Sequence, residues 1–266
     1  MSTLTETVFE NPMLLEARRF FRKFFGLSRF SKFHYGTLVF VGVAYLFLVL
    51  ITIAYREAIT SDYIIHFQTF LLCFVVPTVT YGAIAGEREK RTWDLLMIAP
   101  IRKSQIILGK FICAAVVVVL IAVQMFPLVM ISALGNHDPA IGVFTNEITS
   151  IGFGCGAAAL GIFLSALVNR GFTAQVAIYS VLFLWLVMLP MLMAEISQTS
   201  MRSFNLWIHP FTSIAMNSPN AWDTRMAYLG YGASMQFLLY GSMTAIFVWM
   251  AIHRISDSSE RKITHG

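Results

Sequence analysis

The stretch Glu87–Lys110, EREKRTWDLLMIAPIRKSQIILGK, is the densest cluster of charge in a chain that is otherwise mostly apolar. It encloses an apolar island that runs from Leu95 to Ala99 and stops at Pro100. Thr92 can cap a short helix here, because its side-chain oxygen can accept a hydrogen bond from the first turn. Proline disfavours helical geometry at the residue before it. We therefore expect a helix of about two turns, much shorter than the roughly 20 residues that cross a bilayer.

This short helix is apolar on most of its surface, with Trp93, Leu96 and Met97 on one face. A helix of this kind beside basic residues has two stable locations, the lipid surface and a groove in a partner protein. Composition alone does not distinguish them, and packing at the membrane interface is the more common of the two.

The composition predicts an all-α integral membrane protein. Hydrophobic residues make up 57% of the 266 residues, charged residues only 12%, and the mean hydropathy is +0.70. This apolar content exceeds what one soluble core of this size would use. Six apolar segments of span length predict six transmembrane helices, at residues 36–55, 63–86, 106–134, 148–168, 173–194 and 228–252.

An amphipathic helix is expected before the first span. Asn11-Pro12 is a typical helix start, and aromatic and basic residues follow it at helical spacing. Such a helix lies flat in the membrane interface, with its aromatic side chains in lipid and its cations on anionic head groups. The residues expected at this interface are Arg18, Arg19, Phe21, Arg22 and Phe25.

Basic residues are distributed unevenly around the predicted spans. With the N-terminus inside, 16 of the 19 Lys and Arg residues lie on the inner side and three on the outer side. Because inner loops are rich in Lys and Arg, both termini and the charged stretch should be cytosolic. The net charge of +5 therefore reflects topology and not nucleic-acid binding. The expected organisation is a tail with an interfacial elbow helix (1–35), a transmembrane domain (36–252) that includes an inner loop (87–105) and an outer re-entrant segment (195–227), and a cytosolic tail (253–266).

The order of residues in the charged stretch, E-x-E-x-x-T-x-D-x-L-x-x-A-P-I followed by basic residues and I-I-x-G-K, resembles the membrane subunits of type-2 ATP-binding-cassette (ABC) exporters. Arg102 departs mildly from that pattern, because the family commonly has a small polar residue at this position. In the family this segment is a cytosolic coupling helix that docks in a cleft of a separate ATPase. The resemblance implies that the residues in contact with the ATPase are Glu87, Glu89, Thr92, Trp93, Asp94, Leu96, Met97 and Pro100.

The resemblance also has consequences for cofactors and partners. The chain has no G-x-x-x-x-G-K-[ST] phosphate loop, so ATP and Mg²⁺ should be bound by the ATPase subunit and no cofactor by this chain. Six spans are half of the usual twelve, so a second membrane subunit should complete the path, in a homodimer or a heterodimer. The expected location is the plasma (inner) membrane of a bacterial-type cell. Glu87 is expected to pair with a basic group of the ATPase or of the elbow helix.

The sequence lacks the residues that other classes of membrane protein require. The predicted spans carry no Asp, Glu, Lys or Arg near the bilayer centre, which argues against an ion-coupled carrier, and no motif of a metal or catalytic site is present. Gln124 and Gln175 are the better candidates for a translocation path among the interior polar residues. Gly152 and Gly156 predict close helix packing, within the chain or, less commonly, between subunits. The alternative to an exporter subunit is a stand-alone channel or secondary carrier that works without an ATPase.

Overall fold

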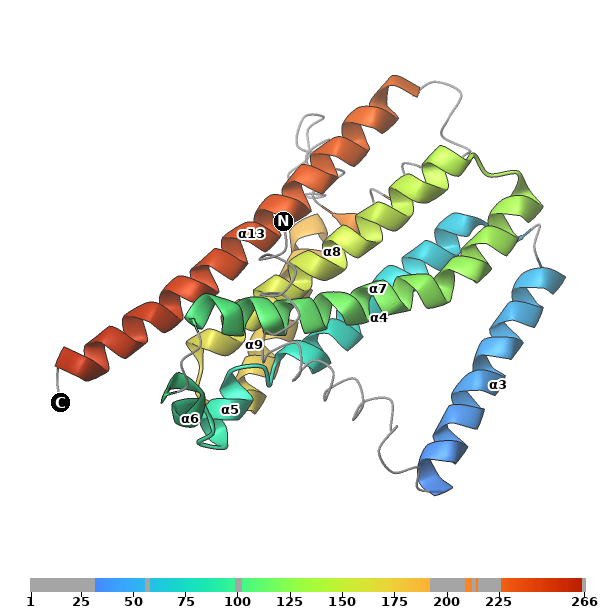
Figure 1. The fold of residues 1–266 in the computed structure, drawn as a ribbon. Helices are drawn as coiled ribbons and strands as arrows, with labels where there is room; N and C mark the ends of the chain where they lie inside the picture. Colours follow the sequence, from blue (N-terminus) through green and yellow to red (C-terminus); the bar gives the residue numbers. More distant parts are fainter. Residues whose placement is uncertain are drawn as a thin grey trace, which may run out of the picture.

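The structure is a computed structural model, and it describes residues 32–55, 58–98, 102–191, 209–211, 214 and 226–264. These residues form helices and the turns between them, without strands (Figure 1). The expected all-α architecture is therefore confirmed for the described part of the chain. The elements are α3 (Lys32–Ala54), α4 (Ser61–Thr80), α5 (Ala85–Glu89), α6 (Trp93–Ile98), α7 (Lys103–Asn136), α8 (Ala140–Leu167), α9 (Gly171–Phe183), the π-helical turn η1 (Leu184–Met188) and α13 (Met226–Thr264).

Five helices of the described part are long and apolar enough to cross a membrane, at Ser61–Glu89, Lys103–Asn136, Ala140–Leu167, Gly171–Met191 and Gln236–Ile255. The helix expected as the first span, α3, has 23 residues and includes the apolar stretch Gly42–Ala54. A total of six spans therefore stays a prediction. The five interface residues of the predicted elbow helix lie outside the described residues, as does most of the outer segment 195–227.

Helix α8 lies at the centre of the bundle, with α4, α7, α9 and α13 packed around it (Figure 1). Small residues of α8 allow this crowding. Gly152 lies beside Tyr240 and Gly156 lies beside Met243, both on α13. The Gly152/Gly156 pair therefore packs within the chain, and the expected intramolecular use of this motif is confirmed. Helix α3 stands apart from the other helices and packs chiefly along α7, where the Tyr45 hydroxyl donates to the carbonyl of Gln124 over 2.7 Å.

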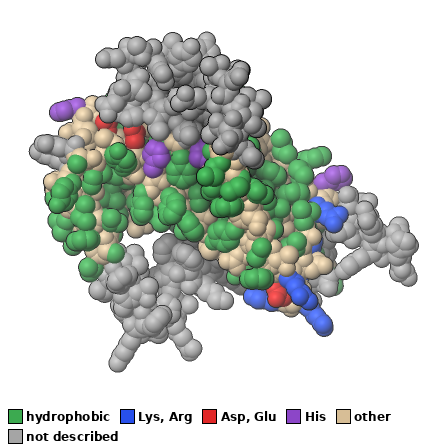
Figure 2. Space-filling view, turned by 180° about the vertical axis from the view of Figure 1, so that it is seen from behind, with side chains coloured by type: hydrophobic (Ala, Val, Ile, Leu, Met, Phe, Trp, Pro, Cys, Tyr) green, Lys and Arg blue, Asp and Glu red, His purple; other side chains and the backbone are tan. Residues whose placement is uncertain are grey.

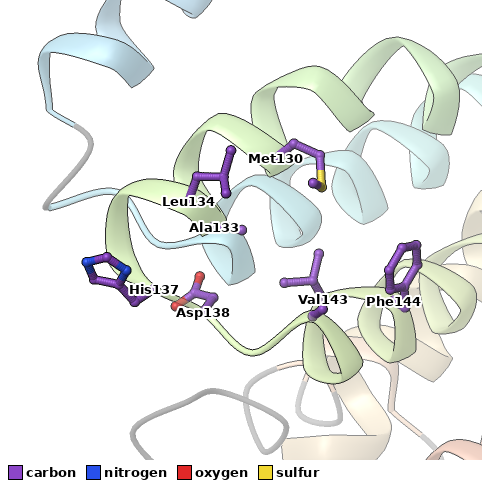
Figure 3. A pocket seen from close by; sticks show the side chains of 8 residues that line it. Met130, Ala133, Leu134, His137, Asp138, Val143 and Phe144 are labelled. Carbon is purple, nitrogen blue, oxygen red and sulfur yellow. The ribbon is translucent and has the colours of Figure 1, made fainter.

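The connection between α7 and α8 is tight and differs from the sequence prediction. Helix α7 is followed by His137, which adopts the left-handed conformation (φ 56°), and the Asp138 N–H donates to the Ala133 carbonyl over 2.9 Å. Helix α8 then begins at Ala140, not at residue 148 as expected. The helix thus begins before the expected span, and Asn146 and Glu147 in this extension are paired with Asp62 and Gln68 of α4. A small pocket of about 330 Å³ lies in this corner between Met130, His137 and Phe144 (Figure 3).

The fifth span contains a π-helical turn just before Pro190. Pro190 has no N–H, so the carbonyl of Leu186, four residues earlier, loses its usual helical donor. The ring of His209, from the segment between α9 and α13, donates from Nε2 to this carbonyl over 2.9 Å. Burial lowers the pKa of His209, and its bond to Leu186 opposes that effect in part. The outer segment is thus attached to the fifth span through the ring of His209.

The two ends of the bundle differ in charge. Most described basic residues lie at the end that carries α5 and α6, and Figure 2 shows the Lys and Arg side chains gathered at one end beside a broad hydrophobic surface. These residues are Arg88, Lys90, Arg91, Arg102, Lys103, Lys110, Arg170 and Arg254. At the opposite end the described charged residues are carboxylates, Asp62, Asp138 and Glu147. This distribution matches the polarity expected for a cytosolic α5–α6 end.

Candidate functional site

The predicted second span is interrupted at its inner end, and one side chain of α8 satisfies the break. Helix α4 ends at Thr80, and α5 begins at Ala85. The Ser165 hydroxyl accepts hydrogen bonds from the N–H groups of Ile84 (3.1 Å) and Ala85 (3.0 Å), and it donates to the carbonyl of Tyr81 (2.8 Å). Since a free backbone group inside a membrane costs several kcal/mol, this serine permits the chain to turn here.

Helix α5 is held by three charged side chains, each bound to a different helix. Glu87 Oε1 accepts from the Lys110 ammonium of α7 over 2.5 Å. Arg88 Nη1 donates to the carbonyls of Ala166 (2.8 Å) and Val168 (3.3 Å), where α8 ends. These contacts place a cation against the negative end of a helix dipole.

Glu89 makes the opposite arrangement. Its Oε2 accepts from the Gly171 N–H, the first residue of α9, over 2.9 Å, so an anion lies at the positive end of that helix. The charged stretch therefore connects α7, α8 and α9 at one point. Within the described residues Glu87 pairs with Lys110, and the predicted pairing with the ATPase or the elbow helix stays a prediction, because both lie outside them.

A sharp turn separates α5 from α6. Arg91 has a positive φ of 57°, and the N–H and hydroxyl of Thr92 both donate to the carbonyl of Glu87, over 3.0 and 3.2 Å. Thr92 precedes the short helix as predicted, but its hydroxyl closes the end of α5 and does not cap the start of α6. Helix α6 itself spans Trp93–Ile98, which agrees with the short helix expected from the sequence.

Helix α6 has one side chain inside the bundle and one outside it. Trp93 is buried in a hydrophobic cluster with residues of α7, α8 and α13, and the Arg88 guanidinium lies 5.5 Å from the centre of its ring. Leu96 packs partly against the same cluster, whereas Ile98 is 81% exposed. Asp94 and Met97 lie within the helix, and Pro100 lies outside the described residues.

Residues 30–256 match the model of a protein family described as ABC-2 family transporter protein. The chain belongs to the ABC-2 transporter family. A comparison with curated proteins finds no match. Family membership and the apolar helices together identify a multi-pass membrane protein that is a permease component of an ABC transporter.

The two glutamines predicted to line a path in this ABC-2 permease are not brought together. Gln124 is exposed on α7, and Gln175 is half-buried on α9. These two helices make little contact with each other in the described part of the chain. A path that uses both residues would need a surface outside this single subunit, and their role stays a prediction.

The buried polar residues of the permease lie elsewhere, at the end of the bundle opposite α5 and α6. Gln68 Nε2 on α4 donates to Glu147 Oε1 (2.9 Å) and to the Ser150 hydroxyl (3.2 Å) on α8. Asn146 Nδ2 donates to Asp62 Oδ1 over 2.8 Å. The sequence prediction missed Glu147 because the fourth span was expected to begin one residue after it. The available signal was Asn146, Thr149 and Ser150, which recur at helical spacing and extend the helix backwards.

Proposed function

We propose that this chain is the transmembrane subunit of an ATP-driven ABC exporter, in which ATP hydrolysis on a separate subunit drives substrate translocation by alternating access. ATP and Mg²⁺ are bound by that ATPase and not by this chain. The observation that carries the proposal is the α5–α6 segment, which interrupts a membrane helix, projects an exposed isoleucine, and is bonded to three other helices.

The bonds of the α5–α6 segment explain how movement of an ATPase reaches the bundle. A push on α6 acts through Trp93 on a cluster that includes Ile106 of α7, Ile162 of α8 and Ala251 of α13. A displacement of α5 acts through Glu87 on α7 and through Arg88 and Glu89 on the α8–α9 junction. Because packed interfaces resist continuous deformation, these helices would move together between two arrangements.

The surface offered to the ATPase differs from the face predicted from the sequence. Trp93 is 7% exposed, so it supports the coupling segment from inside the subunit. Ile98 provides the exposed apolar contact at the end of α6, and Thr92 lies exposed at its start. The second membrane subunit would pack on the apolar outer surface of the bundle, and the basic end would face the cytosol of a cell with this protein in its plasma membrane.

The test is the association of the permease with its ATPase after Ile98→Asp. The protein is tagged, purified from the membranes of its native host, and assayed for ATP hydrolysis that co-purifies with it. Burial of an isoleucine contributes about 1.5–3 kcal/mol. The ATPase activity that co-purifies with the variant should therefore be at least tenfold lower than with the wild type. Helix α6 carries the change at its exposed end, so the yield and melting temperature of the permease itself should not change.

Two control variants separate docking from general damage. Ile98→Val keeps the apolar contact and should retain the ATPase. Phe172→Asp changes another apolar residue at the same end of the bundle, 75% exposed in the first turn of α9 where an acid is tolerated, and it should retain the ATPase as well. Equal ATPase recovery with Ile98→Asp and wild type would mean that α6 is only interfacial packing, and the stand-alone channel or carrier would become the better proposal.

A further inference from the structure

A buried polar cluster joins α4 to α8 at the end of the bundle opposite α5 and α6. We call Gln68, Thr69, Glu147 and Ser150 the α4–α8 polar cluster. Besides the two bonds that Gln68 donates, the Thr69 and Ser150 hydroxyls lie 2.9 Å apart, and Thr69 also bonds to the Ile65 carbonyl over 2.8 Å. Glu147 is 7% exposed, and the other three side chains are fully buried.

This cluster has more buried hydrogen-bond acceptors than donors. The side-chain amide of Gln68 has two N–H groups, and both are used, on Glu147 Oε1 and on Ser150. Two buried acceptors, Gln68 Oε1 and Glu147 Oε2, have no hydrogen-bond partner. Because buried polar atoms in native proteins are nearly always bonded, two open acceptors in one cluster indicate that a donor or a positive charge belongs there.

The surrounding charges do not supply that donor. Among the described residues no Lys or Arg lies at this end, and no cationic side chain pairs with Glu147. Other titratable groups on the elements packed here include Asp62, Tyr63 and His66 of α4, His137 and Asp138 at the α7–α8 corner, and Tyr240 of α13. The two ring nitrogens of His66 lie 2.6 Å and 2.9 Å from the carbonyl oxygens of Asp62 and Phe211, so both contact backbone groups.

We propose that Glu147 is a proton-binding site. In the arrangement that the structure shows, the carboxyl group carries a proton on Oε2, which it exchanges with solvent water. A proton needs no cavity, removes the unfavourable buried charge, and supplies the donor that the cluster lacks. The inference concerns the permease alone and is independent of an ATPase.

The first test is infrared spectroscopy of the purified full-length permease at pH 7. The wild type should show the C=O band of a protonated carboxylic acid, shifted in heavy water, and Glu147→Gln should lack it. Asp138→Asn is the matched control, because Asp138 Oδ2 already accepts two bonds from Ser61, at 3.2 Å from the backbone N–H and 2.5 Å from the hydroxyl. It should keep the band. A spectrum that is the same in the wild type and in Glu147→Gln would overturn the proposal.

The second test is the pH dependence of unfolding, measured on the same two proteins in detergent. A glutamate in an unfolded chain is ionised above about pH 4.3, so the native state binds a proton that the unfolded state has released. The stability of wild type relative to Glu147→Gln should therefore fall as pH rises from 5 to 8, by up to about tenfold in the folding equilibrium per pH unit. Parallel pH profiles would contradict the proposal. The proposal would also be contradicted if NaCl or KCl stabilised the wild type but not Glu147→Gln, because a metal cation would then occupy the site.

Discussion

Replacement of Gly161 by alanine should destabilise the permease, although alanine is the better helix former. Gly161 lies where α8 crosses the last turn of α4, and a Cβ added there would lie 2.2 Å from Thr80 Oγ1 and 2.9 Å from Thr80 Cβ. The threonine cannot rotate away freely, because its hydroxyl donates to the Val76 carbonyl over 2.9 Å and its side chain is buried. Either Thr80 rotates and loses this hydrogen bond, or the two helices are pushed apart.

The expected size of the effect follows from three terms. Overpacking of a buried site costs about 1–3 kcal/mol, and loss of the Thr80 hydrogen bond costs about 1 kcal/mol. The gain from placing alanine instead of glycine in a helix is about 1 kcal/mol. Gly161→Ala should thus lower the free energy of unfolding by about 1–3 kcal/mol. The same change at Gly152 should raise it by up to about 1 kcal/mol, because its nearest neighbour, Tyr240 Cβ, lies at an ordinary 3.5 Å.

The assay is denaturant-induced unfolding of the purified permease in a fixed detergent, with the wild type, Gly161→Ala and Gly152→Ala compared at one protein concentration. Thr80→Ala should recover part of the loss in the Gly161→Ala background, because it removes the nearest clashing atom. If Gly161→Ala is as stable as Gly152→Ala, the close approach of α4 and α8 is not present in the folded protein, and the reasoning fails.

Three further changes test other parts of the fold. A cysteine at Asp138 should react with an impermeant thiol reagent added to intact cells, and one at Lys90 should not; labelling at Lys90 would reverse the proposed orientation. Ser165→Ala should lower the free energy of unfolding by about 1–3 kcal/mol, because two buried N–H groups at the start of α5 lose their acceptor. Unchanged stability would mean that water replaces the hydroxyl. His209→Gln should remove a loss of stability that the wild type shows as pH falls below about 6.5, because the neutral ring is the form favoured by burial and bonded to Leu186; equal acid sensitivity of the two proteins would contradict this.

The sequence by itself determined the class of the protein and the position of its most distinctive segment. Long apolar runs have few alternatives to membrane helices, because a bilayer leaves backbone groups nothing else to bond. The short helix at Trp93–Ile98 was predictable for an equally local reason, since Pro100 and the charged residues before it limit the length of any helix there. The resemblance to ABC exporters rested on this same segment, and the match over residues 30–256 confirms the family.

The tertiary structure alone decided which side chains of these segments face one another. Trp93 was predictable as part of an apolar face, but its burial depends on residues of α7, α8 and α13 that are far from it in sequence. Nothing in the sequence marks Ser165, and its role depends on the fold that brings the break between α4 and α5 next to its hydroxyl. Glu147 lies one residue before the start that was expected for the fourth span. Its place inside the bundle depends on Gln68, 79 residues earlier, whose amide offers the hydrogen bond that lipid cannot provide.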